Sequence, residues 1–124
     1  MSTSREKNTS PAPDWSPLIV GGVVALIAGR WHLRILNRLE AGPLRRTVLR
    51  EQVGPISDKV LTESLRRLEG AGLVYRTMIP TVPIEVDYAL TPLAGTLRRL
   101  LVEIHLWGTE NAVPTSGGRT LDLD

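Results

Sequence analysis

The stretch from residue 54 to residue 90 constrains the fold more than any other part of the sequence, because its pattern changes twice within a short distance. Gly54-Pro55 is a sharp break, and Ser57 is a residue type that caps helix N-termini. Leucines then recur at helical spacing on one face until glycines stop the pattern. These leucines are Leu61, Leu65 and Leu68, and the stop is Gly70-Ala71-Gly72.

Two short runs rich in Val, Ile and Tyr follow, at residues 73–79 and 85–90. This composition favours β-strands. The link between them, "PTVP", has a proline at each end, so we expect a stiff, protruding hairpin loop. Residues 44–53, ahead of the break, have a short helical pattern. Two helices joined by a short Gly-containing turn and followed by a β-hairpin are typical of a winged helix-turn-helix.

Three further helices are expected around this unit, at residues 16–28, 30–41 and 92–107. The first of them is apolar nearly all round, so we expect it to be buried on more than one face. It is shorter than the roughly 20 apolar residues of a membrane span. The expectation is therefore a cytoplasmic protein without a membrane partner, mainly α-helical with a small β-hairpin wing.

The two ends of the sequence differ from its middle. Residues 1–14 are rich in Ser, Thr and Pro and predict a disordered arm, and residues 111–124 predict a flexible tail. This leaves residues 15–110 as the expected folded domain.

Composition excludes several chemistries. The 124 residues contain no cysteine, which removes disulfides, thiolate nucleophiles and the usual zinc sites. The two histidines, His32 and His105, lie far apart, and no spacing matches a metal site, a catalytic triad or a phosphate-binding loop. We therefore expect no enzyme, no cofactor and no metal.

Charge is unevenly distributed, although the net charge is only +2. Residues 30–76 carry ten Arg or Lys and five Asp or Glu, a net charge of +5, whereas residues 77–124 sum to −3. A basic middle suits a surface that binds a polyanion. The charge distribution alone does not distinguish such a binding surface from a charged face that only contacts solvent.

Opposite its leucines, the helix after Ser57 carries Lys59, Thr62 and Arg66 on one face. A recognition helix offers such donors and hydroxyls to base edges and phosphates in the major groove, although an amphipathic surface helix has the same pattern. The arginines of residues 45–50 suit phosphate contact or plain solvation. The candidate DNA contacts are Arg45, Arg46, Arg50, Ser57, Lys59, Thr62, Arg66, Arg67, Arg76 and Thr81.

Three stretches, "GRWHLRILNRLEAGPLR", "ISDKVLTESLRRLEGAGLVYR" and "VDYALTPLAGTL", resemble the HxlR-type bacterial winged helix-turn-helix regulators in order and spacing. The resemblance covers about residues 28–107. It implies a homodimeric transcription regulator that pairs through its first and last helices. It also implies that the fourth helix enters the major groove of a pseudo-palindromic double-stranded operator, and that Arg76 and residues 80–83 form the wing.

The chain departs from that family pattern at several positions. Many relatives have a cysteine before the first helix and some sense oxidants through it, so its absence here predicts no thiol-based sensing. Glu85 stands where the wing usually has a cation, and Arg46 stands where an aromatic is usual. Glu85 and the low net charge keep an alternative open, a winged-helix interaction module that does not bind DNA.

The apolar first helix also suggests a small apolar effector, held near the dimer interface in place of a thiol signal. A plain dimer core explains the same residues. The candidate ligand contacts are Val23, Ile27, Trp31, His32, Arg34, Ile104 and Trp107.

Overall fold

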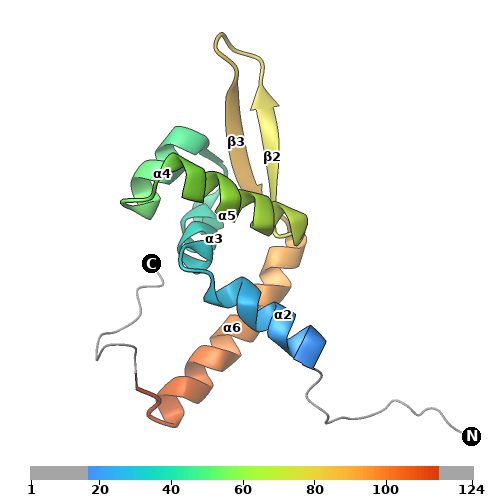
Figure 1. Cartoon of the computed structure of the whole chain (residues 1–124), viewed down its shortest axis with the longest axis vertical. Helices are drawn as coiled ribbons and strands as arrows, with labels where there is room; N and C mark the ends of the chain where they lie inside the picture. Colours follow the sequence, from blue (N-terminus) through green and yellow to red (C-terminus); the bar gives the residue numbers. More distant parts are fainter. Residues whose placement is uncertain (1–16, 115–124) are drawn as a thin grey trace, which may run out of the picture.

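Helices form most of the described part of the chain, residues 17–114 of a computed structural model, and a small sheet projects from them (Figure 1). In chain order the elements are α2 (Pro17–Ala28), α3 (His32–Arg38), the 3₁₀ turn η1 (Leu39–Ala41), β1 (Leu44–Arg45), α4 (Arg46–Val53), α5 (Asp58–Gly70), β2 (Val74–Ile79), β3 (Glu85–Leu90) and α6 (Pro92–Glu110). The predicted winged helix-turn-helix is confirmed. The predicted arm at 1–14 and residues 115–124 of the predicted tail lie outside the described residues.

The wing has three strands in the order β1-β3-β2, all antiparallel. Tyr88 of β3 lies opposite Leu44 of β1 on one side and opposite Arg76 of β2 on the other. The prediction of a helix from residue 44 is therefore wrong at its start. Arg45 is extended, with ψ at 142°, because it pairs with β3 before the helix begins.

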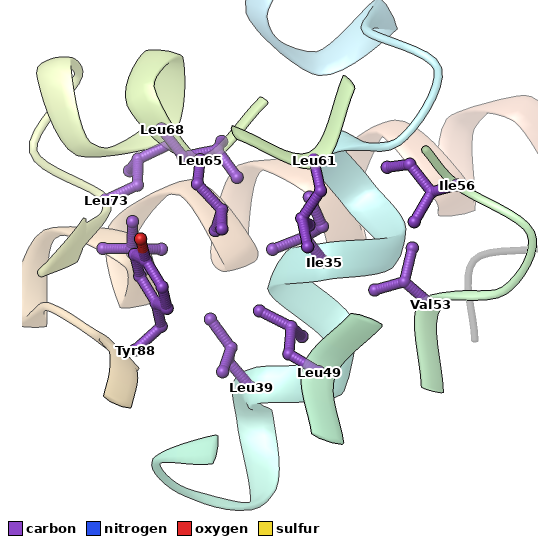
Figure 2. Close-up of a cluster of buried hydrophobic side chains, with 12 residues drawn as sticks. Ile35, Leu39, Leu49, Val53, Ile56, Leu61, Leu65, Leu68, Leu73 and Tyr88 are labelled. Atoms are coloured by element: carbon purple, nitrogen blue, oxygen red, sulfur yellow. The ribbon is translucent and has the colours of Figure 1, made fainter. Parts of the chain in front are cut away.

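The side chains of α5 complete one core with α3, η1 and α4. Leu61, Leu65 and Leu68 are at most 1% exposed, and Figure 2 shows them among apolar side chains from the other elements. Burying one leucine stabilises the fold by roughly 1.5–3 kcal/mol, so this face of α5 is fixed inward. Their buried neighbours include Ile35, Leu39, Leu49, Val53, Ile56, Leu73 and Tyr88.

Arginines of α3 hold the C-terminal end of α4. The Arg34 guanidinium donates to the carbonyl of Val53 at 3.1 Å, and Arg38 donates to the carbonyl of Gln52 at 3.2 Å. The last carbonyls of a helix lack partners within it and favour cations. Gly54 then turns the chain at φ 115°, in the region that favours glycine. The turn between α4 and α5 therefore has a fixed direction.

α2 is far more exposed than the sequence predicts. Leu18 is 89% exposed and Ile19 is 71% exposed. The prediction that this helix is buried on more than one face is wrong for a single chain. The reason is that α2 packs mainly against α3 within residues 17–114, which leaves many of its apolar side chains exposed in a single chain.

His32 joins α2 to α3. Its ring is buried, and Nδ1 donates to the carbonyl of Leu26 in the last turn of α2 at 2.6 Å. A Cβ at residue 29 would lie 2.3 Å from His32 Nδ1, which is closer than real Cβ atoms come to other atoms. Gly29 is therefore required for the ring to reach this carbonyl.

We expect Gly29→Ala to lower the free energy of unfolding by about 1–3 kcal/mol, because the methyl group displaces a buried, hydrogen-bonded ring. Gly70→Ala is the matched control, since a Cβ there meets no atom within 4 Å and alanine favours a helix. Urea unfolding of both variants checks this. Equal stability of the Gly29→Ala variant and the wild type would show that His32 does not need the space.

Candidate nucleic-acid interface

α5 presents a polar face on the side away from its leucines. Ser57 caps the helix, because its Oγ accepts from the backbone N–H of Val60 at 3.1 Å. Lys59 and Arg66 are exposed, and Thr62 between them is half-buried. The three residues that the sequence placed on one face do lie on the exposed side of α5. Arg67, one residue beyond Arg66, is exposed too but is turned by about 100° around the helix.

A hollow of about 340 Å³ lies between α5 and the wing. It brings together four of the predicted DNA contacts from α4, α5 and β2, although they are far apart in sequence. Asp58 and Glu69, which the sequence analysis did not select, lie among them. The lining residues are Arg46, Asp58, Thr62, Arg66, Glu69, Arg76, Val86 and Tyr88.

Carboxylates pair with most of the cations around the hollow. Arg46 donates to Oδ1 of Asp58 at 2.7 Å and to Oγ1 of Thr62 at 2.7 Å. The hydrogen bond and charge of Arg46 lower the pKa of the Asp58 carboxyl. Arg76 Nε lies 3.4 Å from Oε2 of Glu69. The hollow is therefore a network of ion pairs rather than a purely positive surface.

Arg45 has partners within the wing. Its Nε donates to Oδ1 of Asp87 at 2.6 Å, and its Nη1 donates to Glu85. These hydrogen bonds raise the pKa of the Arg45 guanidinium. Glu85, which departs from the family pattern, is thus the partner of a cation on the neighbouring strand. The pair fastens β1 to β3.

The remaining predicted contacts lie around this surface. Arg50 donates to the carbonyl of Ile56 at 3.2 Å and so holds the turn before α5. Thr81, at the tip of the wing, donates to the carbonyl of Pro83 at 2.8 Å. The tip itself is apolar, with Val82 fully exposed.

The predicted ligand contacts come from three parts of the chain, namely α2, residues 31–34 and α6. His32 and Arg34 have the structural roles described above, and the Trp31 ring lies under Arg30 and Arg34 at 5.0 and 5.6 Å. Val23 and Ile27 lie on α2 and are partly exposed. Ile104 and Trp107 line an open hollow of α6 residues alone.

Within residues 17–114, no three His, Asp or Glu side chains gather as a metal site. None of the helices in this range is long and apolar enough to cross a membrane alone. Two consecutive segments, Leu18–Ala28 and His32–Ala41, together have the length and apolar composition of a membrane span, but they are bent by 65° relative to each other.

The fold and this surface define a winged helix-turn-helix protein. The profile of the HxlR-like helix-turn-helix family matches residues 26–116, and the chain belongs to this family. It is 42% identical over 92 residues to an uncharacterised HTH-type transcriptional regulator of Halalkalibacterium halodurans, an overlap of 73% of this chain and 81% of the relative. It is accordingly a transcriptional regulator of the helix-turn-helix type.

Solved structures of transcriptional regulators have the same fold as this chain. A regulator of the MarR family from Enterococcus faecalis superposes with a TM-score of 0.71 at 30% identity, over 85% of this chain and 94% of that one. The reduced form of the regulator YodB from Bacillus subtilis superposes with a TM-score of 0.69 at 30% identity, over 79% of this chain and 96% of that one.

We expect Ser57→Ala to lower the free energy of unfolding by about 1 kcal/mol, because the cap on α5 is lost. Ser57→Asp should keep wild-type stability, since aspartate caps a helix equally well and suits its positive end. Thermal unfolding at neutral pH compares the two. If both variants lost the same stability, the hydroxyl would have a role other than capping.

Proposed function

We propose that this protein is a homodimeric, sequence-specific DNA-binding regulator that places α5 in the major groove of a pseudo-palindromic operator. The observation that carries the proposal is the exposed face of α5, with Lys59, Thr62 and Arg66 opposite a fully buried leucine stripe. A face so fixed and so rich in donors suits base edges and phosphates. We place its action in the bacterial cytoplasm, where the DNA lies.

The residues of the proposed DNA-binding surface fall into three groups, which suit bases, phosphates and the DNA beside the wing. Arg66 and Thr62 face the hollow beside the wing and suit contacts to bases, together with the Ser57 hydroxyl at the tip of α5. Lys59, Arg50 and Arg67 are exposed cations that suit phosphates. Arg76 and Thr81 suit the DNA flank under the wing. Arg45 is left out of this set because Glu85 and Asp87 already hold it.

We expect Arg66→Ala to weaken binding to the protein's own upstream DNA by about 1–3 kcal/mol, the usual cost of a lost base contact. Arg99→Ala removes the same charge from the exposed surface of α6 and should leave the affinity nearly unchanged. Mobility shifts over a range of salt concentrations measure both, and wild-type binding should weaken steeply with salt. No shift at micromolar wild-type protein would favour an interaction module.

The proposed dimer rests on α2 and α6. Both helices expose large apolar side chains and lie on the side of the molecule away from the wing (Figure 1). Extensive apolar exposure marks interaction sites, and a two-fold pair would bury it while leaving both α5 helices free. The exposed residues are Leu18, Ile19, Val20, Val23, Val24, Leu93, Leu100, Val102, Ile104, Leu106 and Trp107.

We propose that an apolar effector binds between α2 and α6 of the two chains. The first support is that Val23, Ile27, Ile104 and Trp107 are all partly exposed in one chain. The second is that these 124 residues contain no cysteine, whereas a solved relative, HypR, is described as a redox regulator. A thiol of this chain therefore has no part in the proposed signal.

We expect the full chain to sediment as a dimer at micromolar concentration and Val24→Glu to shift it toward the monomer, because the carboxylate would enter an apolar seam. Val82→Glu makes the same change at an exposed valine of the wing tip and should leave the dimer intact. Sedimentation velocity distinguishes the two variants. A monomeric wild-type protein would contradict the proposed dimer.

A further inference from the structure

Arg46 lies beside the proposed DNA interface, yet its guanidinium is directed at the protein's own recognition helix. Its side chain is 26% exposed, less than that of Arg50 at 47% or Arg76 at 55%. It starts at the first residue of α4 and reaches the first turns of α5. Its position in the sequence predicts a phosphate contact, but these hydrogen bonds indicate another role.

One guanidinium holds two side chains of α5 at once. Nη1 of Arg46 donates to Oδ1 of Asp58, and Nη2 donates to Oγ1 of Thr62, each at 2.7 Å. Asp58 and Thr62 are four residues apart and so lie one turn from each other on the same face. Because the guanidinium is planar and rigid, it sets the positions of the carboxylate and the hydroxyl relative to each other.

This arrangement leaves one donor and one acceptor unused. A hydroxyl oxygen that accepts from a guanidinium still has its own proton to donate. Within residues 17–114, the Thr62 hydroxyl proton has no acceptor, and Oδ2 of Asp58 has no donor. Both residues line the hollow between α5 and the wing. Their remaining hydrogen-bonding capacity is therefore available to a ligand at that surface.

We propose that Arg46 is a positioning residue of the DNA interface, which presets Thr62 as a donor and Asp58 as an acceptor for the edges of neighbouring bases. The proposal rests on the proposed DNA-binding function. A free carboxylate oxygen suits a base amino group, N4 of cytosine or N6 of adenine, and a hydroxyl proton suits O6 or N7 of guanine or O4 of thymine. Phosphates offer only acceptors, so Asp58 fits base edges and not the backbone.

Arg46 also reduces the electrostatic repulsion that the Asp58 carboxylate would have with the DNA phosphates. An unpaired carboxylate would repel the phosphates on either side of the groove, whereas the Arg46–Asp58 pair has no net charge. A phosphate ligand and a positioning residue therefore differ in one measurable property. Removing a phosphate ligand reduces the salt dependence of binding, whereas removing a charge-balanced pair does not.

The experiment uses the full chain and a double variant, Arg46→Gln with Asp58→Asn, which keeps the net charge. A preferred site is first selected with the wild type from a duplex library with a randomised core. Fluorescence anisotropy then gives the affinity of each protein for that duplex and for a scrambled duplex over about 50–200 mM salt. Lys59→Ala is the control for a lost phosphate contact, and Thr62→Val removes the preset donor alone.

We expect the double variant to lose about tenfold in preference for the selected over the scrambled duplex and to keep the wild-type salt slope. Lys59→Ala should lower that slope by about 0.9. Thr62→Val should reduce the preference too, and adding it to the double variant should cost little more, because Arg46 acts partly through Thr62.

A double variant that keeps the wild-type preference would overturn the inference alone, and an added loss of about 0.9 in salt slope would identify Arg46 as a phosphate ligand. A wild type that binds both duplexes equally well would instead contradict the proposed sequence-specific binding. A wild type that binds neither duplex would contradict the proposed DNA binding altogether. Either of these last two results would remove this inference as well.

Discussion

The direction of α5 depends on the burial of one row of leucines. Leu61, Leu65 and Leu68 have at most 1% of their surface exposed, and they meet apolar side chains from α3, η1 and α4 (Figure 2). With this face held in the core, the opposite face of the helix has to point outward. Packing in the core therefore sets the direction of this face, and the Arg46 guanidinium then fixes the Thr62 hydroxyl and the Asp58 carboxylate on it.

Arginines have two uses in this protein, and the larger one is internal. Arg34 and Arg38 bind the end of α4, Arg45 fastens β1 to β3, and Arg46 bridges to α5. Each of these four guanidiniums already has a carboxylate or carbonyl partner. The basic middle of the sequence therefore overstates the unpaired positive charge on the surface of the folded chain.

Features encoded by neighbouring residues could be predicted from the sequence. The Ser57 cap, the leucine spacing and the glycines after residue 69 predict α5 to within a residue, because each signal acts within one or two turns. β1 could not be predicted this way, since its two residues are extended only by pairing with a strand about 40 residues later. The exposure of α2 was missed because apolar composition predicts burial, whereas α2 packs mainly against α3 and leaves Leu18 and Ile19 exposed in a single chain.

The same distinction applies to the candidate site. The face of α5 follows from helical spacing, so the sequence could place Lys59, Thr62 and Arg66 together on its outer side. The roles of Asp58 and Glu69 were missed, because they arise from partners on α4 and β2 that only the folded chain brings near. Asp58 lies four residues before Thr62, and this spacing was the one sequence signal that could have placed it on that face.

In the proposed dimer, the buried leucines of each chain direct its α5 outward, so that the two α5 helices enter successive major grooves. Hydroxyl-radical footprinting on a selected duplex tests this arrangement most directly. We expect two protected regions related by a two-fold axis, with centres about 10 bp apart on one face of the DNA. A single protected region without two-fold symmetry would contradict the proposed binding of a dimer through both α5 helices.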